Sequence, residues 1–243
     1  MNDAIDELLG QLKLAELRET VSRELARAQK TKPSYADFYA TVLRAQHALV
    51  RERALKTRLR LARLPEPWTL ETFPFDRQPG VHAPQIRQLG ELDFLTKKEN
   101  IVFVGPTGVG KTGLAIGLLL KAIENGYRGV FVKAQDLFDD MYASLADRSS
   151  KRLLTHLARL DLLVIDEMGY LNLKPEQSNL FFKLLEERYS RRATILTTNL
   201  DYDAWHDFLG RKEMVQALLS RLRHRCHTIH IDGPSLREPA PTA

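Results

Sequence analysis

The chain has 243 residues, little cysteine and no long hydrophobic stretch. A single cysteine, Cys226, cannot form an intrachain disulfide. No stretch approaches the roughly 18 apolar residues of a transmembrane helix, so the sequence predicts no membrane insertion. The first twenty residues carry five acidic side chains where a secretion signal would need an apolar run. We therefore expect a protein of the cytoplasm with no membrane partner.

Internal repeats and low-complexity segments are also missing. The composition, 44% hydrophobic and 28% charged, is that of an ordinary globular chain and excludes disordered and collagen-like classes. The net charge of +5 is modest for this length. Since a basic helix face is more often solvated surface than a nucleic-acid site, this charge alone does not predict DNA binding.

Residues 1–64 predict a helical N-terminal domain that contacts DNA or a protein partner. Apolar residues recur at helical spacing from Ile5 to Ala28 and again from Phe38 to Leu49, and the segment 31–34 separates the two runs. We therefore expect a helical hairpin. Its second half is basic, since between positions 44 and 63 one acid, Glu52, stands against Arg44, Arg51, Arg53, Lys56, Arg58, Arg60 and Arg63.

The rest of the chain predicts an α/β core. Five prolines between positions 65 and 100 indicate a linker and core-entry segment in which a domain boundary falls. From 101 to 237, helices alternate with apolar strands, which predicts a parallel sheet covered by helices on both faces. Residues 238–243 resemble a loose C-terminal end. The expected strands are 101–104, 129–133, 162–165, 193–198 and 227–231.

A phosphate-binding loop follows the first expected strand. Its glycines allow backbone N–H groups and the next helix N-terminus to surround phosphates. Lys111 can then reach the β- and γ-phosphates, and the Thr112 hydroxyl can hold Mg²⁺, so we expect ATP and Mg²⁺ as ligands. The loop fits the pattern GxxxxGK[ST] with Gly105, Pro106, Thr107, Gly108, Val109, Gly110, Lys111 and Thr112.

Polar side chains end the third and fourth expected strands. Asp166 and Glu167 follow a buried strand, at the sheet edge where ligands of such folds bind. Asp166 is suited to the Mg²⁺ shell and Glu167 to polarising the attacking water. Asn199 ends the following strand and can orient that water. The alternative is a helix N-cap, because Asn199 and Asp201 precede a helical stretch.

A late helix carries three arginines around an apolar stripe: Arg221, Arg223 and Arg225. One of them is a candidate arginine finger for a neighbouring subunit, and the alternative is solvated or DNA-facing charge. A cluster of histidines and one cysteine next to this helix has the residue types of a zinc site. However, the sequence has no CxxC pair, and His227 and His230 would point to opposite faces of a strand. The cluster consists of His224, Cys226, His227 and His230.

The ordered motifs resemble the IstB/DnaC-like branch of the AAA+ ATPases, especially the IstB-type helper ATPases of bacterial insertion sequences. The motifs are LPEPWTLETFPF, GPTGVGKT, LLVIDEMGYL, ILTTNL, ALLSRLRHR and HTIHIDGPSLR. The resemblance implies a five-stranded AAA+ core with little or no helical lid, a homo-oligomer assembled with ATP on double-stranded DNA, and a partner transposase. By motif position, Asn199 resembles sensor 1, Arg221 an arginine finger supplied in trans, and Arg237 the second sensor.

Two residues depart from the family pattern. Gly113 stands where a histidine is usual, and Leu236 where an aromatic is common. The segment 134–159 matches the place where the initiator and loader branch carries an extra helical element that lines the DNA path. By itself this segment predicts an amphipathic helix followed by a basic, solvated turn.

Three other functions compete with a transposition helper. The nearest is a replicative helicase loader of the DnaC type, which often carries a metal-binding or helicase-binding N-terminal segment that is not found in this sequence. A small-molecule kinase would need a lid of arginines over an acceptor, whereas here the late arginines lie on a helix suited to subunit contact. A non-hydrolysing DNA-binding scaffold would not need Glu167 beside an intact phosphate loop.

Overall fold

The computed structural model describes residues 3–169, 171, 173–210 and 212–237. The chain divides into two compact units, one up to Thr57 and the other from Arg58 onward. Within the described ranges no helix combines the length and apolar character needed to cross a membrane. Residues 238–243, expected as a loose end, lie outside the described residues.

The N-terminal unit is helical, as predicted, and it contains the expected hairpin, but the first arm of that hairpin is divided into two helices. It contains α1 (Asp3–Gln11), α2 (Leu17–Thr31) and most of α3 (Tyr35–Leu61). The first predicted helix ends early because Lys13 adopts a left-handed conformation (φ 57°), and the N–H groups of Lys13 and Leu14 donate to the carbonyls of Gly10 and Leu9. This is a Schellman ending without its usual glycine, which explains why the sequence pattern missed it.

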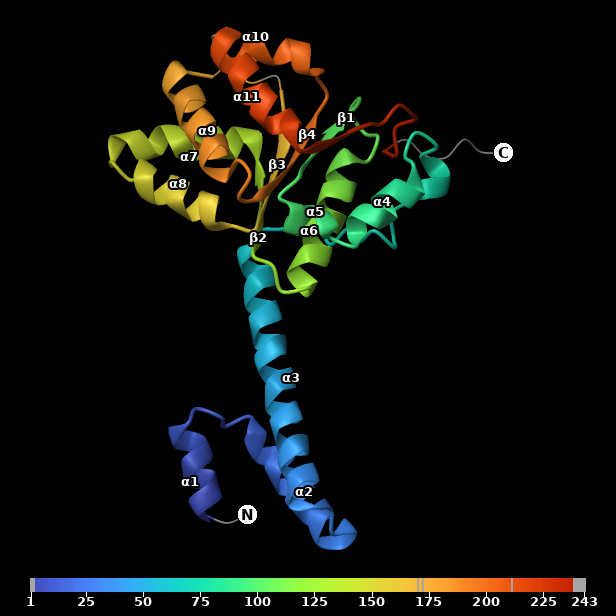
Figure 1. The fold of residues 1–243 in the computed structure, drawn as a ribbon, viewed down its shortest axis with the longest axis vertical. Coiled ribbons are helices and arrows are strands. Elements are labelled where there is room, and N and C mark those ends of the chain that lie inside the picture. Colours follow the sequence, from blue (N-terminus) through green and yellow to red (C-terminus); the bar gives the residue numbers. More distant parts are fainter. Residues whose placement is uncertain (1–2, 170, 172, 211, 238–243) are drawn as a thin grey trace. The chain divides into compact units, whose positions relative to one another are not determined.

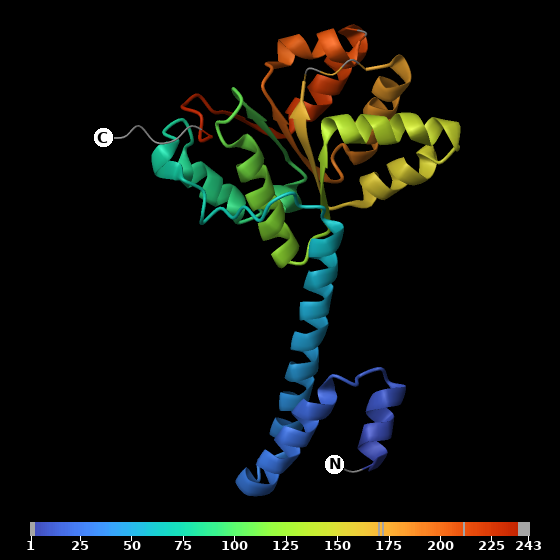
Figure 2. The ribbon, with the colours of Figure 1, turned by 180° about the vertical axis from the view of Figure 1, so that it is seen from behind.

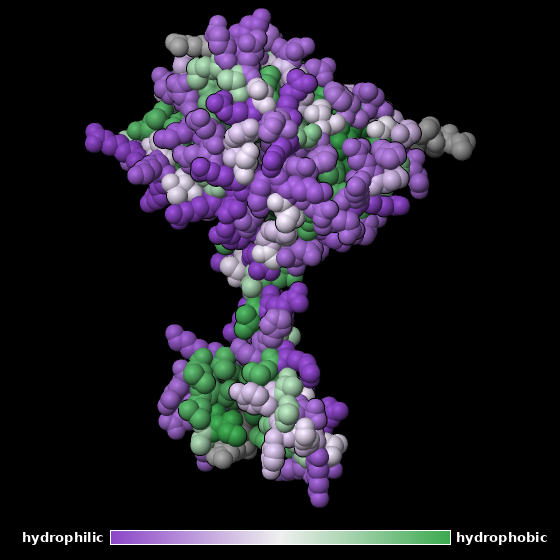
Figure 3. All heavy atoms as spheres, in the orientation of Figure 1, coloured by the Kyte–Doolittle hydropathy of each residue, from purple (hydrophilic) through white to green (hydrophobic). Residues whose placement is uncertain are grey.

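Hydrophobic side chains of this unit are partly exposed. Leu9, Leu17 and Val21 form a small buried core. Figure 3 shows further hydrophobic residues gathered on the visible face of the unit. The exposed large apolar side chains include Leu8, Leu12, Tyr35, Tyr39 and Leu43.

The second unit contains a five-stranded parallel sheet in the order β2-β3-β4-β1-β5 (Figure 1). This confirms the predicted fold class. The expected strand bounds are met to within one residue except in β3, which continues past a register shift and pairs Met168 with Thr198. The strands are β1 (Asn100–Val104), β2 (Gly129–Lys133), β3 (Leu162–Met168), β4 (Ala193–Thr198) and β5 (Cys226–His230).

Helices cover both faces of this sheet (Figure 2). On one face α6 packs on the central strands and α4 packs on α6. The other face is covered by α7, α8, α9, α10 and α11. The bounds are η1 (Phe75–Arg77), α4 (Ala83–Gly90), α5 (Asp93–Lys97), α6 (Lys111–Glu124), α7 (Ala134–Ala146), α8 (Ser150–Arg159), α9 (Pro175–Arg188), η2 (Tyr202–Ala204), α10 (Trp205–Leu209) and α11 (Lys212–His224).

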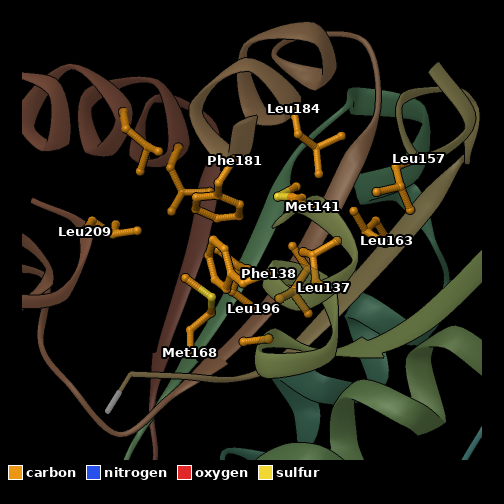
Figure 4. Close-up of a cluster of buried hydrophobic side chains, with 14 of the residues drawn as sticks. Leu137, Phe138, Met141, Leu157, Leu163, Met168, Phe181, Leu184, Leu196 and Leu209 are labelled. Atoms are coloured by element: carbon orange, nitrogen blue, oxygen red, sulfur yellow. The ribbon is translucent and has the colours of Figure 1, made fainter. Parts of the chain in front are cut away.

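One hydrophobic core lies between the sheet and these later helices (Figure 4). Phe138 of α7 and Phe181 of α9 pack with their ring centroids 5.2 Å apart. Strand residues alternate between faces, so Val102 and Val104 enter this core while Ile101 and Phe103 are buried on the other face.

The segment 65–100, expected as a linker, is part of the second unit. It contains η1, α4 and α5, and it buries Phe73, Ile86 and Phe94. Its prolines therefore break the chain into short elements without detaching it from the sheet.

The prediction of a basic, solvated turn at the end of the segment 134–159 is wrong, because residues 150–159 form the helix α8. Leu154 and Leu157 are buried against the core, and Lys151 and Arg152 remain exposed. The buried Arg188 of α9 secures the end of α8, since its guanidinium donates to the carbonyls of Leu157 and Leu160 at 2.7 and 2.9 Å. Burial lowers the pKa of Arg188 to about 9.

Candidate functional site

A cavity of about 700 Å³ opens at the carboxyl ends of β1, β3 and β4. Ligands of parallel α/β sheets bind at this edge. Gly105, Pro106 and Val109 belong to the same loop but are not among the described residues that line the cavity. The predicted residues that do line it are Thr107, Gly108, Gly110, Lys111, Thr112, Asp166, Glu167, Asn199 and Arg237.

The loop after β1 has the backbone shape that its glycines predict. Gly108 and Gly110 have φ values of 90° and 95°, which disfavour other residues. A Cβ on Gly108 would lie 2.3 Å from Ser235 Oγ, and one on Gly110 would lie 2.7 Å from the Phe73 ring. α6 begins at Lys111, so the N–H groups of its first turn lie at the cavity and are suited to bind an anion.

Lys111 lies inside this loop. Its ammonium donates to the carbonyls of Gly105 and Pro106, both at 2.7 Å. Burial lowers the pKa of Lys111, and the charge of Arg237 lowers it further, while Asp166 opposes the change. The ammonium is therefore held where phosphate oxygens can replace the two carbonyls as acceptors.

Asp166 is buried with two hydroxyl partners. It is 2% exposed, and the hydroxyls of Thr112 and Thr197 donate to its Oδ1 at 2.9 and 2.6 Å. Burial raises the pKa of Asp166, whereas the bonds from Thr197 and Thr112 lower it. A carboxylate beside threonine hydroxyls is a donor set that fits Mg²⁺, which prefers oxygen ligands.

Glu167 is turned toward the cavity by an irregularity in β3. Its φ of 61° is left-handed, and the register between β3 and β4 shifts between Ile165 and Met168. The Glu167 N–H donates to Thr197 Oγ1 at 2.9 Å, which stabilises this turn. Such bulges re-aim side chains near active sites. Neighbouring residues 166 and 167 therefore both serve the cavity, one buried and one exposed.

Asn199 lines the same cavity and caps no described helix. Asp201, not Asn199, occupies the cap position of the next helical turn, η2. The N-cap interpretation of Asn199 is therefore wrong.

Arg221 lies outside the cavity. It lines a separate groove of about 220 Å³ between α9 and α11, where its Nη2 is 3.9 Å from Glu186 Oε1. Arg223 stacks over the Tyr202 ring, 4.9 Å from its centroid, and Arg225 Nη1 donates to the Lys97 carbonyl at 3.4 Å. Of the three candidate fingers, Arg221 is thus the one placed on a groove.

The histidine and cysteine residues near β5 have other contacts. His227 Nε2 lies 3.0 Å from Glu99 Oε2, and His224 Nδ1 lies 3.1 Å from the Tyr189 hydroxyl. Burial raises the pKa of Cys226 to about 11. Within the part of the chain that the structure describes, no group of three such side chains is placed to hold a metal ion.

Sequence reasoning missed several residues that line the cavity. Trp68 donates from its indole nitrogen to Glu66 Oε2 at 2.9 Å, and a Cβ on Gly113 would lie 3.4 Å from the Trp68 ring. A side chain at position 113 would therefore begin in van der Waals contact with this ring. Lys133 at the end of β2 lies 3.9 Å from Glu167. The motif LPEPWTLETFPF was the sequence signal for Trp68, and the polar residue at the end of β2 was the signal for Lys133.

Comparison with known proteins finds relatives that come from bacterial insertion sequences. A family described as IstB-like ATP binding proteins matches residues 7–241. The chain is 36% identical over 233 residues to a protein of insertion sequence IS21 from Pseudomonas aeruginosa, covering 96% of this chain and 88% of that one. It is 34% identical to a protein of insertion sequence IS5376 from Geobacillus stearothermophilus, covering 98% and 94%. Both are named as inferred ATP-binding proteins.

The solved structures that share the fold of the second unit include DnaA, DnaI and the DnaC helicase loader. AMPPCP-bound DnaA from Aquifex aeolicus has a TM-score of 0.59 at 22% identity, over 70% of this chain and 51% of that one. DnaI has a TM-score of 0.59 at 20% identity, over 68% and 92%. The DnaC helicase loader has a TM-score of 0.54 at 24% identity, over 62% and 88%. These likenesses show that the second unit has the AAA+ P-loop fold.

Proposed function

This chain belongs to the family of IstB-like ATP binding proteins, and on that premise we propose that it is an ATPase that oligomerises on duplex DNA and helps a transposase engage its target. The observation that carries the ATPase part is one cavity lined by a phosphate loop, a buried carboxylate and an exposed one. The bacterial insertion-sequence relatives support the transposase partner and action in the bacterial cytoplasm.

The residues of the cavity have distinct parts in hydrolysis. Thr112 and Asp166 would hold Mg²⁺, which neutralises the charge that develops on the phosphates. Lys111 binds the β- and γ-phosphates. Glu167 accepts a proton from the attacking water while the oxygen of that water forms a bond to the γ-phosphorus. The bond between the γ-phosphorus and the oxygen that leaves with ADP breaks in the same step. Asn199 orients that water, and Arg237 contacts the phosphates as a second cation.

Arg221 acts in the next subunit of the oligomer. Because Arg221 lies on a groove away from the nucleotide cavity of its own subunit, it can act only in the nucleotide cavity of another copy. A head-to-tail interface between subunits allows such a contact. An arginine supplied in this way neutralises charge in the transition state. The ion pair with Glu186 exchanges for the phosphate contact when the subunits assemble.

A second groove supports DNA binding. It has a volume of about 870 Å³ and lies along α8, the edge strand β2 and residues 58–63. Among the described residues that line it, Asp140 is the only acid. Apolar side chains form part of its lining, and basic residues surround them: Arg58, Arg60, Arg63, Arg128, Arg148, Lys151, Arg152 and Arg159. Clustered arginines and lysines neutralise DNA phosphates.

A helicase loader of the DnaC type is the alternative within this fold. The identity of 36% to an insertion-sequence protein over 96% of the chain favours transposition, compared with 24% over 62% for the DnaC loader. Added transposase or added replicative helicase would distinguish the two, because only the true partner should change ATP turnover.

The proposal is tested by measuring assembly and turnover together. Mass photometry without nucleotide, with ATP, and with ATP plus duplex DNA should show large assemblies only when both ligands are present. Phosphate release should rise when DNA is added. The Lys111→Ala variant is the control and should neither assemble nor turn over. A wild-type monomer in every condition, with turnover indifferent to DNA, would contradict the proposal.

Loss of charge from α8 should weaken DNA binding in a salt-dependent way. In the Lys151→Ala/Arg152→Ala variant, two phosphate contacts are lost, so the slope of log K against log salt should fall by about 1.8. Fluorescence anisotropy with duplex DNA at several salt concentrations measures this slope. DNA-free ATPase activity should stay unchanged.

A matched variant, Lys183→Ala/Arg191→Ala, removes the same charge from exposed positions outside the groove. Its slope should remain that of the wild type. Equal slopes for both double variants would show that the groove does not contact DNA.

A further inference from the structure

Three segments that are distant in sequence meet beside the phosphate loop, and one buried amide joins them. Gln78, which follows η1, is 0% exposed. Its Nε2 donates to the carbonyl of Val109 at 3.1 Å and to that of Pro234 at 2.9 Å. Its Oε1 accepts a bond from the Gly80 N–H at 3.3 Å. Both N–H groups and the carbonyl oxygen of this side chain are thus used.

The backbones around Gln78 are packed too closely for other side chains. A Cβ on Gly80 would lie 2.0 Å from the Asp232 carbonyl oxygen, and one on Gly233 would lie 1.9 Å from Gln78 Oε1. The chain before the sheet and the chain after β5 therefore touch directly. Glycine at both positions is what allows the Gln78 amide to reach Pro234.

The same C-terminal segment contacts the phosphate loop itself. The Leu236 N–H donates to the Gly108 carbonyl at 2.9 Å. Arg237 follows at once, lines the cavity and lowers the pKa of Lys111, behind the larger effect of burial. The bridge from Val109 through Gln78 to Pro234 therefore ties the loop that holds the phosphates to the segment that carries Arg237.

We infer that Gln78 is a positioning residue that holds Arg237 at the phosphates of ATP. This inference rests on the proposed nucleotide site. Without the two N–H donors, the carbonyls of Val109 and Pro234 lose their partner, and leaving the buried carbonyl of Val109 unpaired is costly. The C-terminal segment then separates from the loop, and ATP loses its contact with Arg237.

The test is a double-mutant cycle on ATP affinity. Gln78→Met keeps the length of the side chain without its donors, and Arg237→Ala removes the positioned cation. Each variant should bind a fluorescent ATP analogue about tenfold more weakly, the size expected for one lost charge-assisted contact. Because both changes remove the same contact, the double variant should also be about tenfold weaker, not a hundredfold.

Two further variants separate positioning from general damage. Gln88→Met makes the same substitution at an exposed position of α4 and should bind ATP as the wild type does. Gly233→Ala places a methyl group against Gln78 Oε1 and should weaken ATP binding as Gln78→Met does. Combined with Arg237→Ala, it should cause no further loss of ATP affinity. It also keeps the test open if Gln78→Met melts below the assay temperature.

Opposite results overturn the inference. An additive cycle, wild-type affinity in Gln78→Met and Gly233→Ala, or wild-type affinity in Arg237→Ala would each do so. A wild-type chain that binds no ATP would instead contradict the proposed nucleotide site, so the two failures are distinguishable.

Discussion

Replacing Glu167 with glutamine should reduce ATP hydrolysis by a factor of about 10² to 10⁴, the usual contribution of a general base. The amide keeps the size of the side chain but cannot accept the proton of the attacking water. Glu167 is exposed at the cavity, while the buried Asp166 remains bonded to Thr112 and Thr197. Binding of ATP and of DNA should therefore persist.

Phosphate release and binding of a fluorescent ATP analogue measure the two sides of this prediction. Glu176→Gln, in the first turn of α9, makes the same change at an exposed position and should leave both quantities unchanged. If Glu167→Gln loses ATP affinity as strongly as it loses hydrolysis, Glu167 is a binding residue and not the base.

Replacing Arg221 with alanine should lower DNA-stimulated hydrolysis by about a thousandfold, the smaller end of what an arginine finger contributes. ATP binding by the single subunit should remain, because Arg221 lies on the groove between α9 and α11 and not in its own cavity. Arg223→Ala is the matched control on the same helix, since Arg223 stacks on Tyr202.

A mixing experiment shows whether Arg221 acts in trans. Arg221→Ala subunits keep Glu167, and Glu167→Gln subunits keep Arg221, so an equal mixture can form complete sites between unlike neighbours. With random head-to-tail assembly, about a quarter of the interfaces are complete, and about a quarter of the wild-type rate should return. A mixture as inactive as its components would place Arg221 outside the shared site.

Local patterns in the chain were sufficient for the sheet and the phosphate loop. Apolar runs bounded by breakers marked the strands because buried parallel strands must be apolar on both faces. The positive φ values of Gly108 and Gly110 follow from the loop that their spacing predicted. Asp166 and Glu167 were recognisable because they end a buried strand.

Tertiary contacts decided what these patterns missed. α8 forms where a basic turn was expected because Leu154 and Leu157 are buried and Arg188 binds the carbonyls at its end. The break after α1 depends on a left-handed Lys13, a residue type that does not signal such a turn.

The sequence by itself determined the parallel α/β core, the phosphate loop and the carboxylates that end a buried strand, because these depend on local spacing and periodicity, while the family followed from the resemblance of the ordered motifs. Only the tertiary structure decided that Trp68 lines the cavity and that Gln78 joins the phosphate loop to the segment that carries Arg237. Contacts between segments more than a hundred residues apart leave no periodic trace in the chain. They follow from how the sheet brings the segment before β1 and the segment after β5 to the same edge.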